Sequence, residues 1–77
     1  PQVAKAVVQQ ILGGNTSIVG LMIESHLHGG NQKIPDNLAD LEYGVSITDG
    51  CIDWQTTSAL LLEVAEQLRA VLPARVA

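Results

Sequence analysis

The sequence predicts an α/β fold in which a helix, a buried strand, a long loop and a second helix follow one another. Three observations predict it: two stretches with apolar residues at helical spacing, one short run without a polar residue, and a long connection between run and second stretch. A strand that is apolar at every position needs cover on both faces and partners in a sheet. The 77 residues supply neither, so we expect them to form part of a domain, not a complete one.

The first helix is predicted over residues 2–12, because its apolar residues form one stripe at helical period. Pro1 suits the first turn of a helix, since its missing N–H would have no partner there. Gly13-Gly14 is a typical C-terminal cap.

The run Ile18–Ile23 is predicted to be the buried strand. The chain turns polar at Glu24-Ser25-His26, directly after it. Active sites of parallel α/β folds are built at the carboxyl ends of strands. Glu24 is therefore a candidate site residue, and a carboxylate that caps the strand end or pairs with an arginine is the equally weighted alternative.

Residues 27–55 form a predicted loop, and loops longer than roughly 12–15 residues are uncommon unless they are functional or disordered. The loop contains a short β-like piece, Val45–Thr48, and several apolar residues that are unsuited to a free linker. We expect an ordered functional loop. Tyr43 and Trp54 are interpreted as anchors in the core or the loop.

The last helix is predicted over residues 56–72, with a wide apolar stripe opposite its charged residues. Thr56 or Thr57 is the expected N-cap, and Pro73 is expected to end the helix.

The composition argues against several classes of protein. Four basic and eight acidic residues give a net charge of −4, and the basic residues are scattered, so no nucleic-acid partner is expected. No apolar run approaches the roughly 20 residues of a membrane span, so no membrane partner is expected either. Cys51 is the only cysteine, which fits a reducing cytosol.

Glu24, His26 and His28 alternate along the chain and would share one face if the strand continued. A carboxylate with two histidines is the ligand set of several metal sites. Hydrogen bonding of the histidines within the loop is the favoured interpretation, because Gly29-Gly30 interrupts the extended geometry. Asp49 precedes a glycine, an ordinary turn signal, and Cys51 is interpreted as a small buried apolar residue.

Three segments in fixed order carry a resemblance to a known family: Met22-Ile23-Glu24-Ser25-His26, then Gly30-Asn31-Gln32, then the run from Tyr43 to Trp54. Together they resemble the C-terminal region of the class I (microbial) 3-deoxy-D-arabino-heptulosonate 7-phosphate (DAHP) synthases. The resemblance implies a TIM barrel, of which this chain would supply helix 7 (residues 1–14), strand 8 (18–24), the active-site loop and helix 8 (56–72). A whole barrel needs about 250 residues.

The resemblance also implies an activity and a metal site. The family condenses phosphoenolpyruvate with erythrose 4-phosphate, the first step of the shikimate pathway to aromatic amino acids. Its divalent metal ion, which is manganese, iron, cobalt or zinc, is held by a cysteine, a histidine, a glutamate and an aspartate. Glu24 occupies the glutamate position and Asp49 the aspartate position, and Asp49 is also the candidate for catalytic proton handling. The family's cysteine and histidine ligands fall outside this sequence.

By the same resemblance, the full enzyme is expected to be a cytoplasmic homo-oligomer, and this segment needs the remainder of the barrel for activity. Phosphate groups call for clusters of arginine and lysine, which the chain lacks. Gly50 and Asp53 depart from the family pattern, in which Ala and Gly are common. Two alternatives remain: a segment of a 3-deoxy-manno-octulosonate 8-phosphate synthase, and a non-enzymatic helical interaction module.

Overall fold

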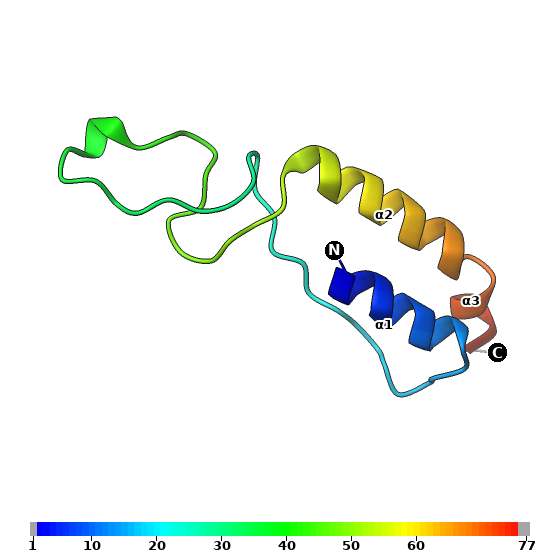
Figure 1. Cartoon of the computed structure of the whole chain (residues 1–77). Helices are drawn as coiled ribbons and strands as arrows, with labels where there is room; N and C mark the ends of the chain where they lie inside the picture. The colour runs from blue at the N-terminus through cyan, green and yellow to red at the C-terminus, as the bar shows by residue number, and fades with distance from the viewer. Residues whose placement is uncertain (1, 76–77) are drawn as a thin grey trace. The chain divides into compact units, whose positions relative to one another are not determined.

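The structure is a computed structural model that describes residues 2–75. These residues form two compact units, one made of residues 2–23 and 59–75 and the other of residues 24–58. The elements are α1 (Gln2–Leu12), the 3-10 helix η1 (Leu38–Asp40), α2 (Trp54–Leu68) and α3 (Val71–Arg75), as Figure 1 shows.

Helix α1 has the bounds that the sequence predicts, and its glycine cap is confirmed. Gly14 has a φ of 104°. Its N–H donates to the carbonyl of Ile11 at 3.1 Å, and the N–H of Asn15 donates to that of Gln10 at 3.0 Å. These two bonds form a Schellman motif, which a glycine in the left-handed region makes possible. The expected role of Pro1 lies outside the described residues.

The core of the first unit is a small aliphatic cluster. Val8 is fully buried, and Ile11 and Leu68 are nearly so. Half-buried residues surround these three side chains: Val7, Ile18, Val64 and Val71. Figure 1 shows α1 lying beside α2, and the cluster fills the space between α1 and the part of α2 from residue 59 onward.

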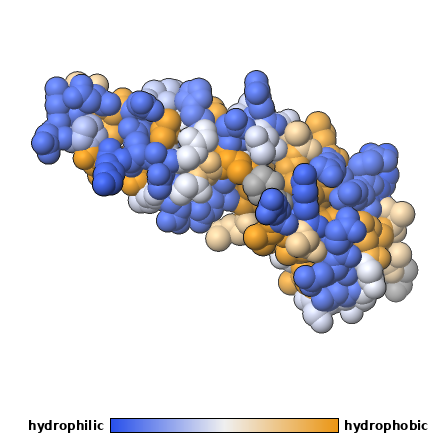
Figure 2. All heavy atoms as spheres, in the orientation of Figure 1, coloured by the Kyte–Doolittle hydropathy of each residue, from blue (hydrophilic) through white to orange (hydrophobic). Residues whose placement is uncertain are grey.

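The strand predicted over 18–23 does not form, and the described residues contain only three isolated β-bridges. Within residues 2–75 this run has no neighbouring strand to satisfy its backbone N–H and C=O groups, which a ladder requires. Val19 and Met22 are 95% and 87% exposed. Apolar side chains remain at the surface in Figure 2.

The last predicted helix begins and ends elsewhere. Asp53, not Thr56 or Thr57, caps α2: its Oδ1 accepts the N–H of Thr56 at 2.7 Å. Helix α2 ends at Leu68, and α3 follows after a turn. Pro73 does not end a helix but lies in the first turn of α3, where a missing N–H costs no hydrogen bond.

The loop of the second unit is ordered, as predicted. Its three segments, residues 24–32, 42–48 and 49–54, are joined by backbone hydrogen bonds. The predicted β-like piece Val45–Thr48 contains one bridge, from Ser46 to Asn31. None of the helices in the described part of the chain has the length and apolar character needed to span a bilayer.

Candidate metal centre

Backbone hydrogen bonds bring the chain around Glu24 against the segment that follows Asp49. The N–H of Ile52 donates to the carbonyl of Glu24 at 3.1 Å, and the N–H of His26 donates to that of Ile52 at 3.0 Å. Gly30 and Cys51 exchange both of their backbone bonds, at 2.8 and 3.0 Å. These bonds fix the two segments in one register.

The two sequence-predicted ligands, Glu24 and Asp49, come together as a result. The charge of Asp49 raises the pKa of Glu24 above its usual value of 4.5, and a side-chain hydrogen bond between the two carboxyl groups and a small loss of hydration act in the same direction. Both residues are exposed. Two neighbouring carboxylates are difficult to ionise together because their negative charges repel, and a cation bound between them would offset this repulsion.

This donor set fits a divalent metal ion, because carboxylate oxygens are ligands for manganese, iron and zinc alike. Glu24 and Asp49 are the two carboxylates that the described chain brings together here. Residues 2–75 contain no group of three or more histidines, cysteines, aspartates and glutamates able to hold a metal ion.

The alternative site made of Glu24, His26 and His28 does not form in the described residues. His26 instead accepts the N–H of Leu27 on its Nδ1 at 2.9 Å, so the interpretation as a histidine bonded within the loop is confirmed for this residue. Cys51 is a half-buried free thiol, so it is less buried than predicted but not fully exposed.

The side-chain amides of Asn31 and Gln32, in the same unit as the pair, make hydrogen bonds that were not predicted from the sequence. The Asn31 Nδ2 donates to the carbonyl of Thr48 at 3.0 Å. The Gln32 Nε2 donates to the carbonyls of Glu42 at 2.8 Å and Val45 at 3.0 Å, and its Oε1 accepts the N–H of Glu42 at 3.0 Å. The only available signal was the run Gly30-Asn31-Gln32 itself, which the family resemblance contains.

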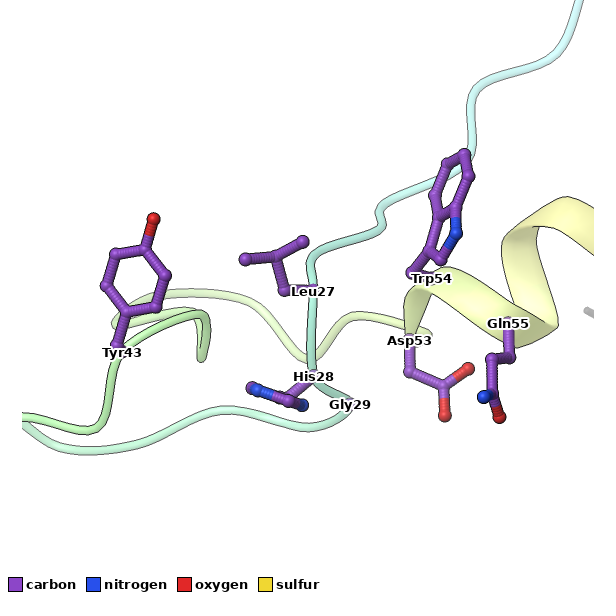
Figure 3. Close-up of a pocket in the computed structure, with 7 residues that line it drawn as sticks. All are labelled: Leu27, His28, Gly29, Tyr43, Asp53, Trp54 and Gln55. Carbon is purple, nitrogen blue, oxygen red and sulfur yellow. The ribbon is translucent and has the colours of Figure 1, made fainter.

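A hollow of about 450 Å³ opens on the second unit, and Figure 3 shows the side chains around it. Its lining consists of Leu27, His28, Gly29, Tyr43, Asp53, Trp54 and Gln55. Tyr43 is 88% and Trp54 61% exposed, so neither is a core anchor in the described chain, and their interpretation as loop anchors stays a prediction.

Asp53 contributes a carboxylate to this hollow, but its main partner is α2. Its hydrogen bonds with Thr56 lower its pKa below the usual 3.8, and the nearby imidazole of His28 lowers it a little further. Asp53 is therefore a helix cap in this structure.

Comparison with known proteins decides the family. The model of the DAHP synthetase I family matches residues 1–62. The chain belongs to this family.

Among its relatives, the Tyr-sensitive phospho-2-dehydro-3-deoxyheptonate aldolase of Escherichia coli K12 is 53% identical over 77 residues, which are 100% of this chain and 22% of the relative. The phospho-2-dehydro-3-deoxyheptonate aldolase AMT16 of Alternaria alternata is 54% identical over 66 residues, 84% of this chain and 18% of the relative. The chain thus spans about a fifth of the length of these family members.

A solved structure agrees with the assignment. The phospho-2-dehydro-3-deoxyheptonate aldolase of Francisella tularensis SCHU S4 matches with a TM-score of 0.76 at 37% identity, over 88% of this chain and 19% of that one.

Proposed function

We propose that this chain is a segment of a DAHP synthase that condenses phosphoenolpyruvate with erythrose 4-phosphate, the first step of the shikimate pathway. The family match and the names of relatives at 53% and 54% identity support this proposal. The same names favour the heptulosonate enzyme over the octulosonate alternative.

In this proposal the chain supplies helix 7, strand 8, the active-site loop and helix 8 of a TIM barrel. The solved relative matches 88% of this chain but only 19% of its own length, which agrees with a segment of a larger fold. Val19, Leu21 and Met22 of the run Ile18–Ile23 are exposed, and neighbouring strands of a barrel would cover such a run on both faces. The family match over residues 1–62 favours this barrel segment over a stand-alone helical interaction module.

The observation that carries the proposed chemistry is the Glu24–Asp49 pair. Glu24 and Asp49 would hold a divalent manganese, iron, cobalt or zinc ion together with a cysteine and a histidine from outside this chain. An ion bound there would supply Lewis-acid polarisation of the tetrose aldehyde. We assign catalytic proton handling to Asp49, which the backbone register places at this pair.

The full enzyme would be a cytoplasmic homo-oligomer, and the free thiol of Cys51 fits a reducing compartment. Glu24 and Asp49 alone would bind metal weakly, and the 77 residues contain no cluster of basic side chains for two phosphorylated substrates. We therefore expect the segment to be inactive without the remainder of the barrel.

The test uses the longer polypeptide that contains this chain. Glu24→Ala and Asp49→Ala should each lower metal stoichiometry and abolish condensation, measured by metal analysis and by consumption of phosphoenolpyruvate. His26→Ala is the matched control, because His26 lies two residues from Glu24 and bonds only within its loop. Full activity and full metal content in both acidic variants would overturn the proposal.

A further inference from the structure

Glu24 and Asp49 lie on separate segments of the second unit, and backbone and side-chain hydrogen bonds join these segments. Asp49 is exposed and lies beside Gly50, whose surroundings are open. The segment that carries Asp49 is exposed on both sides of this residue. The backbone bonds of Gly30 and Ile52 constrain its C-terminal side. Its N-terminal side needs a separate constraint.

Asn31 and Gln32 supply that constraint. They follow Gly30, whose φ of +82° turns the chain into the left-handed region. The Asn31 amide binds the carbonyl of Thr48, the residue directly before Asp49. The backbone N–H of Gln32 donates to the carbonyl of Ser46 at 2.8 Å. Both sides of Asp49 are thus joined to the chain that follows Glu24.

The Gln32 side chain makes hydrogen bonds further from the Glu24–Asp49 pair. Its three hydrogen bonds to Glu42 and Val45 close the base of the excursion formed by residues 33–41. Inside this excursion the bonds of Asn37 are local: its side chain accepts the N–H of Ala39 at 3.1 Å and its carbonyl accepts the N–H of Asp40 at 2.9 Å. The Gln32 bonds thus lie between the excursion and the segment that carries Asp49.

We propose that Asn31 and Gln32 are positioning residues of the metal site, which hold the Asp49 segment in register with the Glu24 segment. This inference rests on the proposed function for its metal and goes beyond it in naming the residues that act through the ligands. Groups that orient metal ligands typically change metal affinity or activity by about 10–100-fold when they are removed.

The experiment compares Asn31→Leu and Gln32→Met, which keep approximate size and lose the hydrogen bonds, with the matched control Asn37→Leu. The longer polypeptide that contains this chain is used throughout. The first measurement is hydrogen exchange of the Cys51 and Ile52 amides, which bind Gly30 and Glu24. The second is the affinity for Mn²⁺ without substrates, and the third is kcat at limiting and at saturating Mn²⁺.

We expect both test variants to exchange these two amides faster, to bind Mn²⁺ about 10-fold more weakly, and to recover kcat at saturating Mn²⁺. Asn37→Leu should match the wild type in all three measurements. Exchange in α1 should stay unchanged, which separates local loosening from unfolding. Asn31 is exposed and makes one side-chain bond, so Asn31→Leu carries the test if Gln32→Met does not fold.

Wild-type exchange and Mn²⁺ affinity in Asn31→Leu would overturn the positioning role, as would an equal loss in Asn37→Leu. Failure of the proposed function gives a different result. In that case Glu24→Ala and Asp49→Ala would leave the Mn²⁺ affinity unchanged. If only the positioning role fails, these two variants still bind Mn²⁺ more weakly than the wild type.

Discussion

Asp49 raises the pKa of Glu24, chiefly through the charge of its carboxylate. Because the pKa of Glu24 is higher in the folded than in the unfolded chain, its contribution to stability is fully present below the usual pKa of 4.5. That contribution is lost as the pH rises through the raised value. At neutral pH without metal, the pair therefore contributes less to stability than it does below pH 4.5.

Replacement of Glu24 by glutamine should separate stability from metal binding. Glu24→Gln removes the repulsion, so we expect the metal-free protein to have a higher Tm at pH 7 than the wild type. The same change removes a ligand and should weaken Mn²⁺ binding by at least about 10-fold. Glu63→Gln, in the exposed part of α2, is the control and should change neither quantity. A Glu24→Gln protein that binds Mn²⁺ normally would contradict the assignment.

The affinity for metal should also depend on pH in a defined direction. A carboxylate ligand must be deprotonated to bind, so Mn²⁺ affinity should fall on acidification as Glu24 is protonated, beginning above pH 4.5. Asp49→Asn should return the pKa of Glu24 toward this usual value. Carboxyl ¹³C NMR of the metal-free protein measures both titrations. The same Glu24 midpoint in wild type and Asp49→Asn would show that the charge of Asp49 is not the cause.

Part of the local structure was predicted correctly from the sequence, and structure that depends on distant partners was not. Helix α1 and its Gly14 cap were predicted correctly, because the stripe and the cap involve residues a few positions apart. The strand over 18–23 was predicted from its composition, but strand formation needs a neighbouring chain segment. The start of α2 was misplaced by two residues, because the cap of Asp53 competed with two threonines.

The candidate site likewise combines residues that were predicted from the sequence with contacts that were not. Glu24 and Asp49 were assigned by resemblance, since no spacing rule joins a strand end to a turn 25 positions later. The hydrogen bonds of the Gln32 side chain could not be predicted from the sequence pattern. Its amide binds backbone carbonyls, whose positions are set by the fold and not by any side-chain pattern.

Gly44 should not tolerate a side chain, unlike Gly50. Gly44 has a φ of +81°, and a Cβ there would lie 2.9 Å from Cδ2 of His28 and 3.0 Å from Cβ of Leu27. Gly44→Ala should therefore cost about 1–3 kcal/mol of unfolding free energy. Gly50→Ala meets no atom within 4 Å and should be neutral within about 0.5 kcal/mol. Urea denaturation measures both, and equal losses would contradict the strain at Gly44.

Arg75 and Arg69 provide a final matched comparison. The guanidinium of Arg75 donates to the carbonyls of Thr16 at 2.6 Å and Ile18 at 2.8 Å, and so joins α3 to the chain that leads toward the run Ile18–Ile23. Arg69 instead pairs with Glu66 at 2.8 Å, and these side chains are 75% and 69% exposed.

Arg75→Ala should cost about 1–2 kcal/mol, because hydrogen bonds to a charged donor are strong and the bond to Ile18 is partly buried. Arg69→Ala should cost at most about 0.5 kcal/mol, since water and salt screen an exposed pair. Urea denaturation at low and at high salt distinguishes the two variants. The loss of stability in Arg69→Ala should vanish at high salt, whereas the loss in Arg75→Ala should persist. An Arg75→Ala effect that disappears with salt would show that its contacts act as an exposed ion pair does, and not as a fixed link between α3 and residues 16–18.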